Sequence, residues 1–83
     1  MDETNILQHL HQASFGERFL IERVDIQGEL KRRLLDLGFV PGGVIEVLKA
    51  SPLGDPISYR VAGTVIALRQ EESQLIWGKV MPS

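Results

Sequence analysis

Five short β-like runs separated by turn residues constrain the fold of this chain more than any other feature of its sequence. The runs are rich in β-branched and aromatic residues; they are Phe19–Val24, Val44–Ala50, Ile57–Val61, Thr64–Leu68 and Leu75–Val80. A chain of 83 residues has room for one domain of ordinary size. A small sheet of such strands is expected to bend and close on itself, because closure removes exposed edges. The pattern therefore predicts a mainly β fold with short helices.

One amphipathic helix is expected between the first two runs, over Glu29–Leu37. Leu30, Leu34 and Leu37 recur there at helical spacing and form an apolar stripe. Gly38 follows directly, which suits the left-handed residue that ends many helices. With this helix in place, the sequence predicts a small SH3-like β-barrel of about five strands with an inserted helix.

The first 14 residues do not fit this pattern of strands. Thr4 can cap a short helix that extends to Leu10, with apolar residues at helical spacing. We therefore divide the chain into an N-terminal helical extension, residues 1–14, and an SH3-like domain, residues 15–83. The extension could dock on the barrel, support self-association or remain loose.

The loop between the second and third runs is stiff and yet carries an apolar residue. It comprises Ser51, Pro52, Leu53, Gly54, Asp55 and Pro56. Proline fixes φ, glycine supplies positive φ, and aspartate can hydrogen-bond its own backbone, so little freedom remains. A rigid loop can insert one apolar side chain into a partner at small entropic cost. Leu53 is thus either a contact residue or a lid folded over the end of the core.

Composition excludes several classes of function. The formal net charge is −2, which argues against a nucleic-acid binder, whose affinity depends on neutralising phosphates. There are no cysteines, hence no disulfides and no thiolate sites. The opening residues, 1–5, include two acids and no basic region, so we expect no secretory signal, and no apolar run is long enough to span a bilayer. These features predict a cytoplasmic protein without direct membrane insertion.

Residues for catalysis or metal binding are sparse. His9 and His11 lie in the N-terminal segment, and Glu71 and Glu72, as sequence neighbours on a helical turn, point in different directions. Together with Asp55 they are the obvious metal ligands, but nothing in their spacing brings three of them together. We therefore predict no enzymatic activity, no metal site and no cofactor.

Two further features have structural explanations. The basic run Lys31-Arg32-Arg33 is expected to form a solvated helix face that could orient the protein against an acidic partner. Tyr59 lies on the inward register of its strand, and Trp77 is expected to pack in the core.

Three segments in order carry a resemblance to a known family. They are Arg33–Gly42, Pro52–Ile57, and Ala67-Leu68-Arg69 followed by acidic residues. Over roughly residues 15–80 the chain resembles the FeoA family, small SH3-like proteins encoded beside the bacterial ferrous iron transporter FeoB. The same domain resembles the C-terminal module of metal-dependent transcriptional repressors.

The resemblance implies a cytoplasmic accessory that binds the cytoplasmic side of FeoB and modulates Fe(II) uptake. It places the partner-binding residues in two segments: Pro52, Leu53, Gly54, Asp55 and Pro56 in the loop, and Leu37, Gly38 and Phe39 at the helix end. Two alternatives stay open: a stand-alone regulatory or peptide-binding module akin to the repressor domain, and a ferrous-ion carrier.

Overall fold

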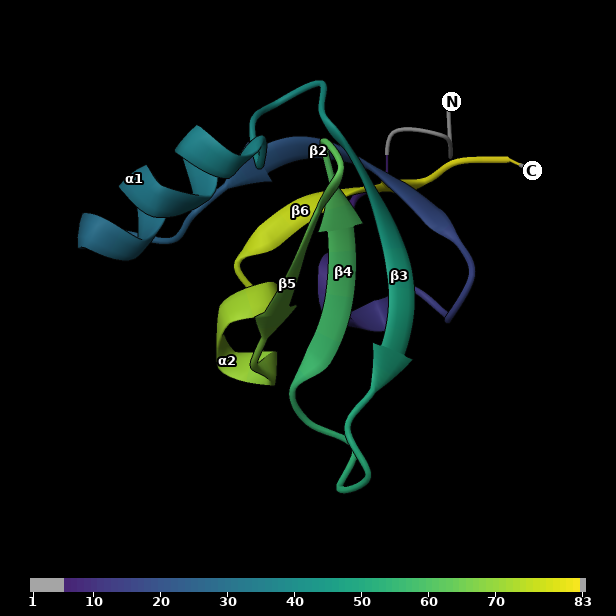
Figure 1. The fold of residues 1–83 in the computed structure, drawn as a ribbon. Helices are drawn as coiled ribbons and strands as arrows, with labels where there is room; N and C mark the ends of the chain where they lie inside the picture. The colour runs from purple at the N-terminus through teal and green to yellow at the C-terminus, as the bar shows by residue number, and fades with distance from the viewer. Residues whose placement is uncertain (1–5, 83) are drawn as a thin grey trace.

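The computed structural model describes residues 6–82 and shows an antiparallel sheet of six strands with short helices beside it (Figure 1). The strands are β1 (Gln8–His9), β2 (Arg18–Val24), β3 (Val44–Ala50), β4 (Ile57–Val61), β5 (Thr64–Leu68) and β6 (Ile76–Val80). The helices are the 3-10 turn η2 (Leu10–Gln12), α1 (Gly28–Leu37) and α2 (Gln70–Ser73). All five expected strands and the expected helix are confirmed, and β3, β4 and β5 have the expected bounds. No helix within residues 6–82 has the length and hydrophobicity needed to cross a bilayer.

The sheet is bent but is not closed into a barrel. Its order is β1-β6-β2-β3-β4-β5, and no pairing within residues 6–82 joins β5 to β1. Strand β1 contributes only two residues, Gln8 and His9, and both pair with β6. The predicted closure is therefore not formed, and β5 remains an edge strand.

Strand β2 lies at the centre of the sheet and pairs with both β3 and β6. Its register with β6 shifts between Ile21 and Arg23, a bulge that increases local twist. Gly78 lies in β6, and a β-carbon at this position would collide with the carbonyl oxygen of Leu20 in β2. The absence of a side chain at Gly78 thus allows β6 to approach β2 closely where the sheet bends.

The bent sheet encloses one hydrophobic core. Fully buried side chains come from every strand of the expected domain and from η2; the largest are Tyr59, Phe19, Phe39, Leu10, Ile21 and Leu34. On β4 the strict alternation places Ile57, Tyr59 and Val61 inward, as the sequence predicts.

The N-terminal segment differs from the expectation. Thr4 and Asn5 lie outside the described residues, but from Gln8 onward the chain forms β1 and then η2, so the predicted helix extending to Leu10 is wrong. Leu10 is fully buried in the core. Strand pairing with β6 and burial of this leucine override the weak helical spacing of a short segment.

Helix α1 ends as the sequence predicts. Gly38 has a φ of 115°, and its N–H donates to the Leu35 carbonyl while the Phe39 N–H donates to the Leu34 carbonyl. These two hydrogen bonds are those of the Schellman motif. Phe39 is thereby turned into the core, where it is fully buried.

The β4–β5 hairpin contains one strained residue. Its turn, Ala62-Gly63, has positive φ at both positions, 50° for Ala62 and 81° for Gly63. This is the requirement of a type I′ turn, which glycine and asparagine meet readily and alanine does not.

We expect Ala62→Gly to raise the free energy of unfolding by about 0.5–1 kcal/mol, because it relieves this backbone strain. Urea unfolding followed by the fluorescence of Trp77 measures the change. Gly63→Ala is the matched control and should lower stability. Equal effects of the two substitutions would contradict the turn geometry.

The hydroxyl of Tyr59 is buried without a hydrogen-bond partner among the described residues. Burial raises the pKa of this hydroxyl above its usual value of 10.0, and the Asp55 carboxylate raises it further. The Ser73 hydroxyl lowers the pKa of Tyr59 and so partly offsets these two effects. No hydrogen bond of ordinary length joins the two hydroxyls. The folded protein therefore favours the neutral phenol more than the unfolded chain does.

It follows that the stability contributed by the neutral phenol is fully present below about pH 10 and is lost as pH rises through the raised pKa. Tyr59→Phe should lose less stability between pH 9 and pH 11 than the parent protein, which thermal unfolding across that range measures. The two proteins differ only in this hydroxyl, so the difference between their pH profiles isolates Tyr59. Parallel pH profiles would contradict the assignment.

Candidate partner-binding site

Leu53 lies at the tip of the β3–β4 loop and is almost completely exposed, at 95% of its accessible surface. In Figure 1 this loop extends beyond the end of the sheet, away from α1. Leu53 therefore does not cover the core, and the lid alternative is wrong. The leucine is the most exposed large hydrophobic side chain within residues 6–82.

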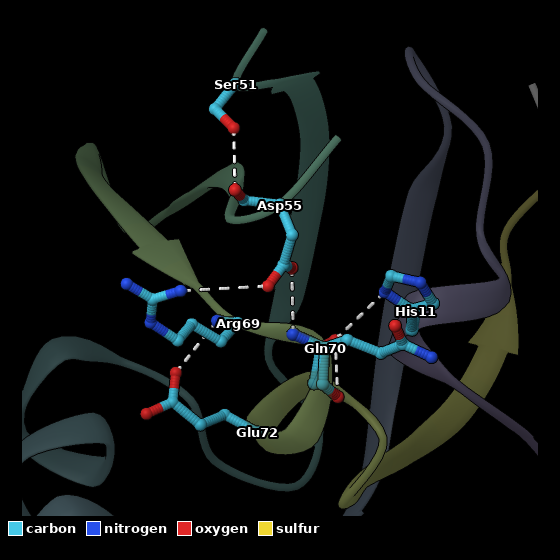
Figure 2. A network of polar contacts seen from close by, with 7 residues as sticks. His11, Ser51, Asp55, Arg69, Gln70 and Glu72 are labelled. Atoms are coloured by element: carbon cyan, nitrogen blue, oxygen red, sulfur yellow. Dashed lines mark hydrogen bonds and ion pairs between the residues drawn. The ribbon is translucent and has the colours of Figure 1, made fainter. Parts of the chain in front are cut away.

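Hydrogen bonds hold the loop that carries this leucine. The Gly54 N–H donates to the Ser51 carbonyl at 2.8 Å, and the Ser51 N–H donates to the Pro56 carbonyl at 3.0 Å. The Ser51 hydroxyl donates to the Asp55 carbonyl at 2.7 Å (Figure 2). The loop is thus closed on itself at its base, as the proline and glycine content indicates.

The carboxylate of Asp55 connects the loop to α2. Its Oδ1 accepts a hydrogen bond from the backbone N–H of Gln70 at 2.9 Å, and Arg69 lies within 4.0 Å of Oδ2 (Figure 2). Asp55 therefore satisfies one of the free N–H groups at the start of this short helix. From the sequence we expected Asp55 to bond its own backbone, so this long-range contact was missed.

The second predicted contact segment is not beside the first. Leu37, Gly38 and Phe39 lie where α1 ends, at the opposite end of β3 from Leu53 (Figure 1). A strand of 7 residues separates the two ends, a length of about 20 Å. The side chain of Phe39 is buried, so it supports the fold and offers no contact surface. The exposed neighbours at that end are Leu35 and Val40, at 36% and 37%.

The two histidines, His9 and His11, contact different residues of the fold. Nowhere within residues 6–82 do three His, Asp or Glu side chains gather as metal ligands. His9 packs edge-on against Trp77, with ring centroids 5.6 Å apart, and Arg23 lies over the same indole. His11 Nδ1 is 3.4 Å from the Ser73 hydroxyl (Figure 2). Trp77 is half-buried between His9 and Arg23, at the margin of the predicted core.

Of the two neighbouring acids on α2, Glu72 has a structural role and Glu71 faces solvent. Glu72 Oε1 accepts a hydrogen bond from the Arg69 N–H at 2.8 Å, whereas Glu71 is exposed. In the basic run of α1, Arg32 and Arg33 are exposed and Lys31 is half-buried, so the expected solvated face is confirmed for the two arginines. The candidate site is therefore the loop of residues 51–56, which hydrogen bonds of Ser51 and Asp55 hold in place.

Several known proteins are similar to this chain in sequence or in fold. A fusion of Fe(2+) transport protein A with the Fe(2+) transporter FeoB from Porphyromonas gingivalis is 37% identical over 67 residues, which are 81% of this chain and 8% of that protein. Iron(II) transport protein A from Clostridium thermocellum is 38% identical with a TM-score of 0.81, and covers 89% of this chain and 46% of its own. FeoA from Chlorobium tepidum is 32% identical with a TM-score of 0.85, over 90% of this chain and 71% of its own. The chain thus spans only a small part of the fusion protein.

The similarity in fold extends to a manganese-dependent transcriptional repressor. That structure is 19% identical with a TM-score of 0.79, over 95% of this chain and 44% of its own. The expected resemblance to a repressor module is confirmed at the level of the fold. The FeoA domain family matches residues 8–80, a range that includes β1 and η2. The chain therefore belongs to the FeoA family.

Proposed function

We propose that the chain is a non-enzymatic accessory of ferrous iron transport that binds the cytoplasmic side of a FeoB transporter and modulates Fe(II) uptake. The observation that carries the proposal is Leu53, exposed at 95% on a loop closed by its own hydrogen bonds. An exposed leucine has no stabilising role in the monomer, whereas its burial against a partner is favourable. No pocket opens within residues 6–82, so contact through a protruding side chain fits this surface.

The relative from Porphyromonas gingivalis supports the choice of partner. In that protein a segment similar to this chain is joined covalently to a FeoB transporter. A covalent link raises the effective concentration of one module beside the other, so that even a small interface is occupied. By analogy, we propose that this chain meets the transporter in the cytoplasm through a small surface, with Leu53 as the residue that is buried in the contact.

The hydrogen bonds that hold the loop determine how much of the free energy gained by burying Leu53 contributes to the binding affinity. Full burial of a leucine contributes roughly 1.5–3 kcal/mol. Ordering a flexible loop would offset much of this. Here Ser51 and Asp55 already hold the loop in one shape, so most of the gain is retained.

We expect Leu53→Asp to weaken binding to the purified cytosolic domain of the transporter by about 10–150-fold, the loss of one buried leucine. The melting temperature of the variant should equal that of the parent protein, because the Leu53 side chain is almost fully exposed and supports no part of the core. Calorimetric titration and thermal unfolding measure the two quantities.

The matched control is Phe15→Asp. It also places an acid at an exposed apolar position, 58% accessible, but outside the loop. Binding should be retained in this variant. Equal loss of affinity in the two variants would contradict a specific role for Leu53 and indicate only that added negative charge repels the partner.

A second pair of substitutions tests the anchoring of the loop. Asp55→Ala removes the acceptor for the Gln70 N–H and should lower stability by about 0.5–2 kcal/mol, as for a lost helix cap. It should also weaken partner binding, because the loop loses its connection to α2. Hydrogen exchange at the Gln70 amide, with the same titration, measures both effects.

Asp55→Asn keeps a side-chain oxygen that can accept from Gln70, and should retain most of the stability and binding. Unchanged binding by Asp55→Ala would show that the Asp55–Gln70 hydrogen bond is not needed for contact with the partner. Equal losses in the alanine and asparagine variants would mean that the negative charge, and not the hydrogen bond, is what matters.

A further inference from the structure

Strand β5 is an unprotected edge of the sheet. It pairs on one side with β4 over all 5 of its residues, Thr64–Leu68, without a register shift. Natural edge strands are usually blocked by charges, proline or a bulge. β5 has none of these, and Val65 is 56% exposed. An uncharged, regular edge of this kind is a template for pairing with another strand.

The register of the hairpin identifies the free backbone groups. The two-residue turn makes Val61 and Thr64 a hydrogen-bonded pair, so alternate residues of β5 bond to β4. Val65 and Ala67 are the residues between them, and their N–H and C=O groups point to the open side of the sheet. No backbone hydrogen bond among residues 6–82 reaches that side.

We propose that β5 pairs antiparallel with β5 of a second copy of this chain, in the register that places Ile66 opposite Ile66 of the second copy. In this register Val65 lies opposite Ala67 of the second copy, and Ala67 lies opposite Val65. The backbone N–H and C=O groups of both residues point to the open side of the sheet, so each pair exchanges two hydrogen bonds. Every free group of the edge is satisfied, and the arrangement has the two-fold symmetry of most dimers.

The side chains of the strand suit this partner. On the outer face each valine is set against a small alanine, a large residue against a small one. On the inner face Ile66 is half-buried and packs against the core, and it would meet its own copy in a non-hydrogen-bonded pair, where side chains are closest. The hydrophobic core of one copy thus continues into the other.

Charge also favours a second copy. Two-fold symmetry places each strand beside an identical one, so a net charge on the strand would meet an equal net charge of the same sign. β5 carries no charged residue between Thr64 and Leu68. The other edge of the sheet, β1, has only 2 residues and offers no comparable surface. Because one short edge buries little area, the dimer is expected to be weak and to depend on concentration.

Concentration-dependent NMR and sedimentation test the pairing on the full chain without any transporter. The amide signals of Val65 and Ala67 should shift together as concentration rises toward about 1 mM, with a matching rise in mean mass. Ala67→Pro removes one outward donor from each copy and leaves the β4 ladder intact, because that N–H does not bond to β4. It should raise the dissociation constant by about tenfold or more.

A charge pair tests the register. In V65K/A67K each introduced lysine faces another lysine across the two-fold axis, and this protein should stay monomeric. In V65K/A67E the lysine introduced at position 65 faces the glutamate introduced at position 67 of the second copy, so association should be retained and should weaken with salt. The two proteins differ only at position 67, and thermal unfolding confirms that each is folded.

A parent protein that stays monomeric at about 1 mM would overturn the proposal. So would identical association by the two charge variants. If the Val65 and Ala67 amides respond only to added transporter domain, the edge binds a strand of the transporter and the second-copy proposal is wrong. The association is measured without the transporter, so its failure is distinct from failure of the Leu53 contact.

Discussion

The close pairing of β2 with β6 is the constraint on which the rest of this small fold depends. β2 pairs with β6 on one side and with β3 on the other, so it joins the two halves of the sheet. The halves can curve around one core only if the strands approach closely at the bend. Gly78, whose β-carbon would collide with the Leu20 carbonyl, permits that approach. The bulge after Ile21 supplies the added twist.

Given this curvature, the candidate loop of residues 51–56 needs little support of its own. β3 and β4 are fixed along their length by pairing, and the last pair before the loop is Ala50 with Ile57. The loop therefore has a rigid base, and Asp55 adds one contact to α2. Leu53 is left as the large hydrophobic side chain of the loop that the fold does not use. A chain of this size can in this way display a hydrophobic residue without weakening its core.

Much of the architecture could be predicted because local signals and burial agree. The alternation of buried and exposed residues in Ile57–Val61 specifies a strand. The helix end is specified by Gly38, which lies between the helical Leu34 and the buried Phe39. Exposure of Leu53 could not be predicted, since the same stiff loop could have folded inward. β1 was missed because two residues carry no periodic signal; only their pairing with Gly78 and Trp77 defines them. The Asp55–Gln70 hydrogen bond and the separation of the two proposed contact segments arise from tertiary geometry, which no local pattern contains.

The pairing of β1 with β6 has a consequence for how this domain can be built into larger proteins. A polypeptide leading into Gln8 and one continuing after Val80 leave from the same side of the sheet, while the β3–β4 loop lies at another end. The fold should therefore tolerate circular permutation, with a short linker joining β6 to β1 and new ends opened elsewhere. It is equally suited to insertion into a host protein, where both connections would enter through one point and the apolar tip would stay free to contact its target.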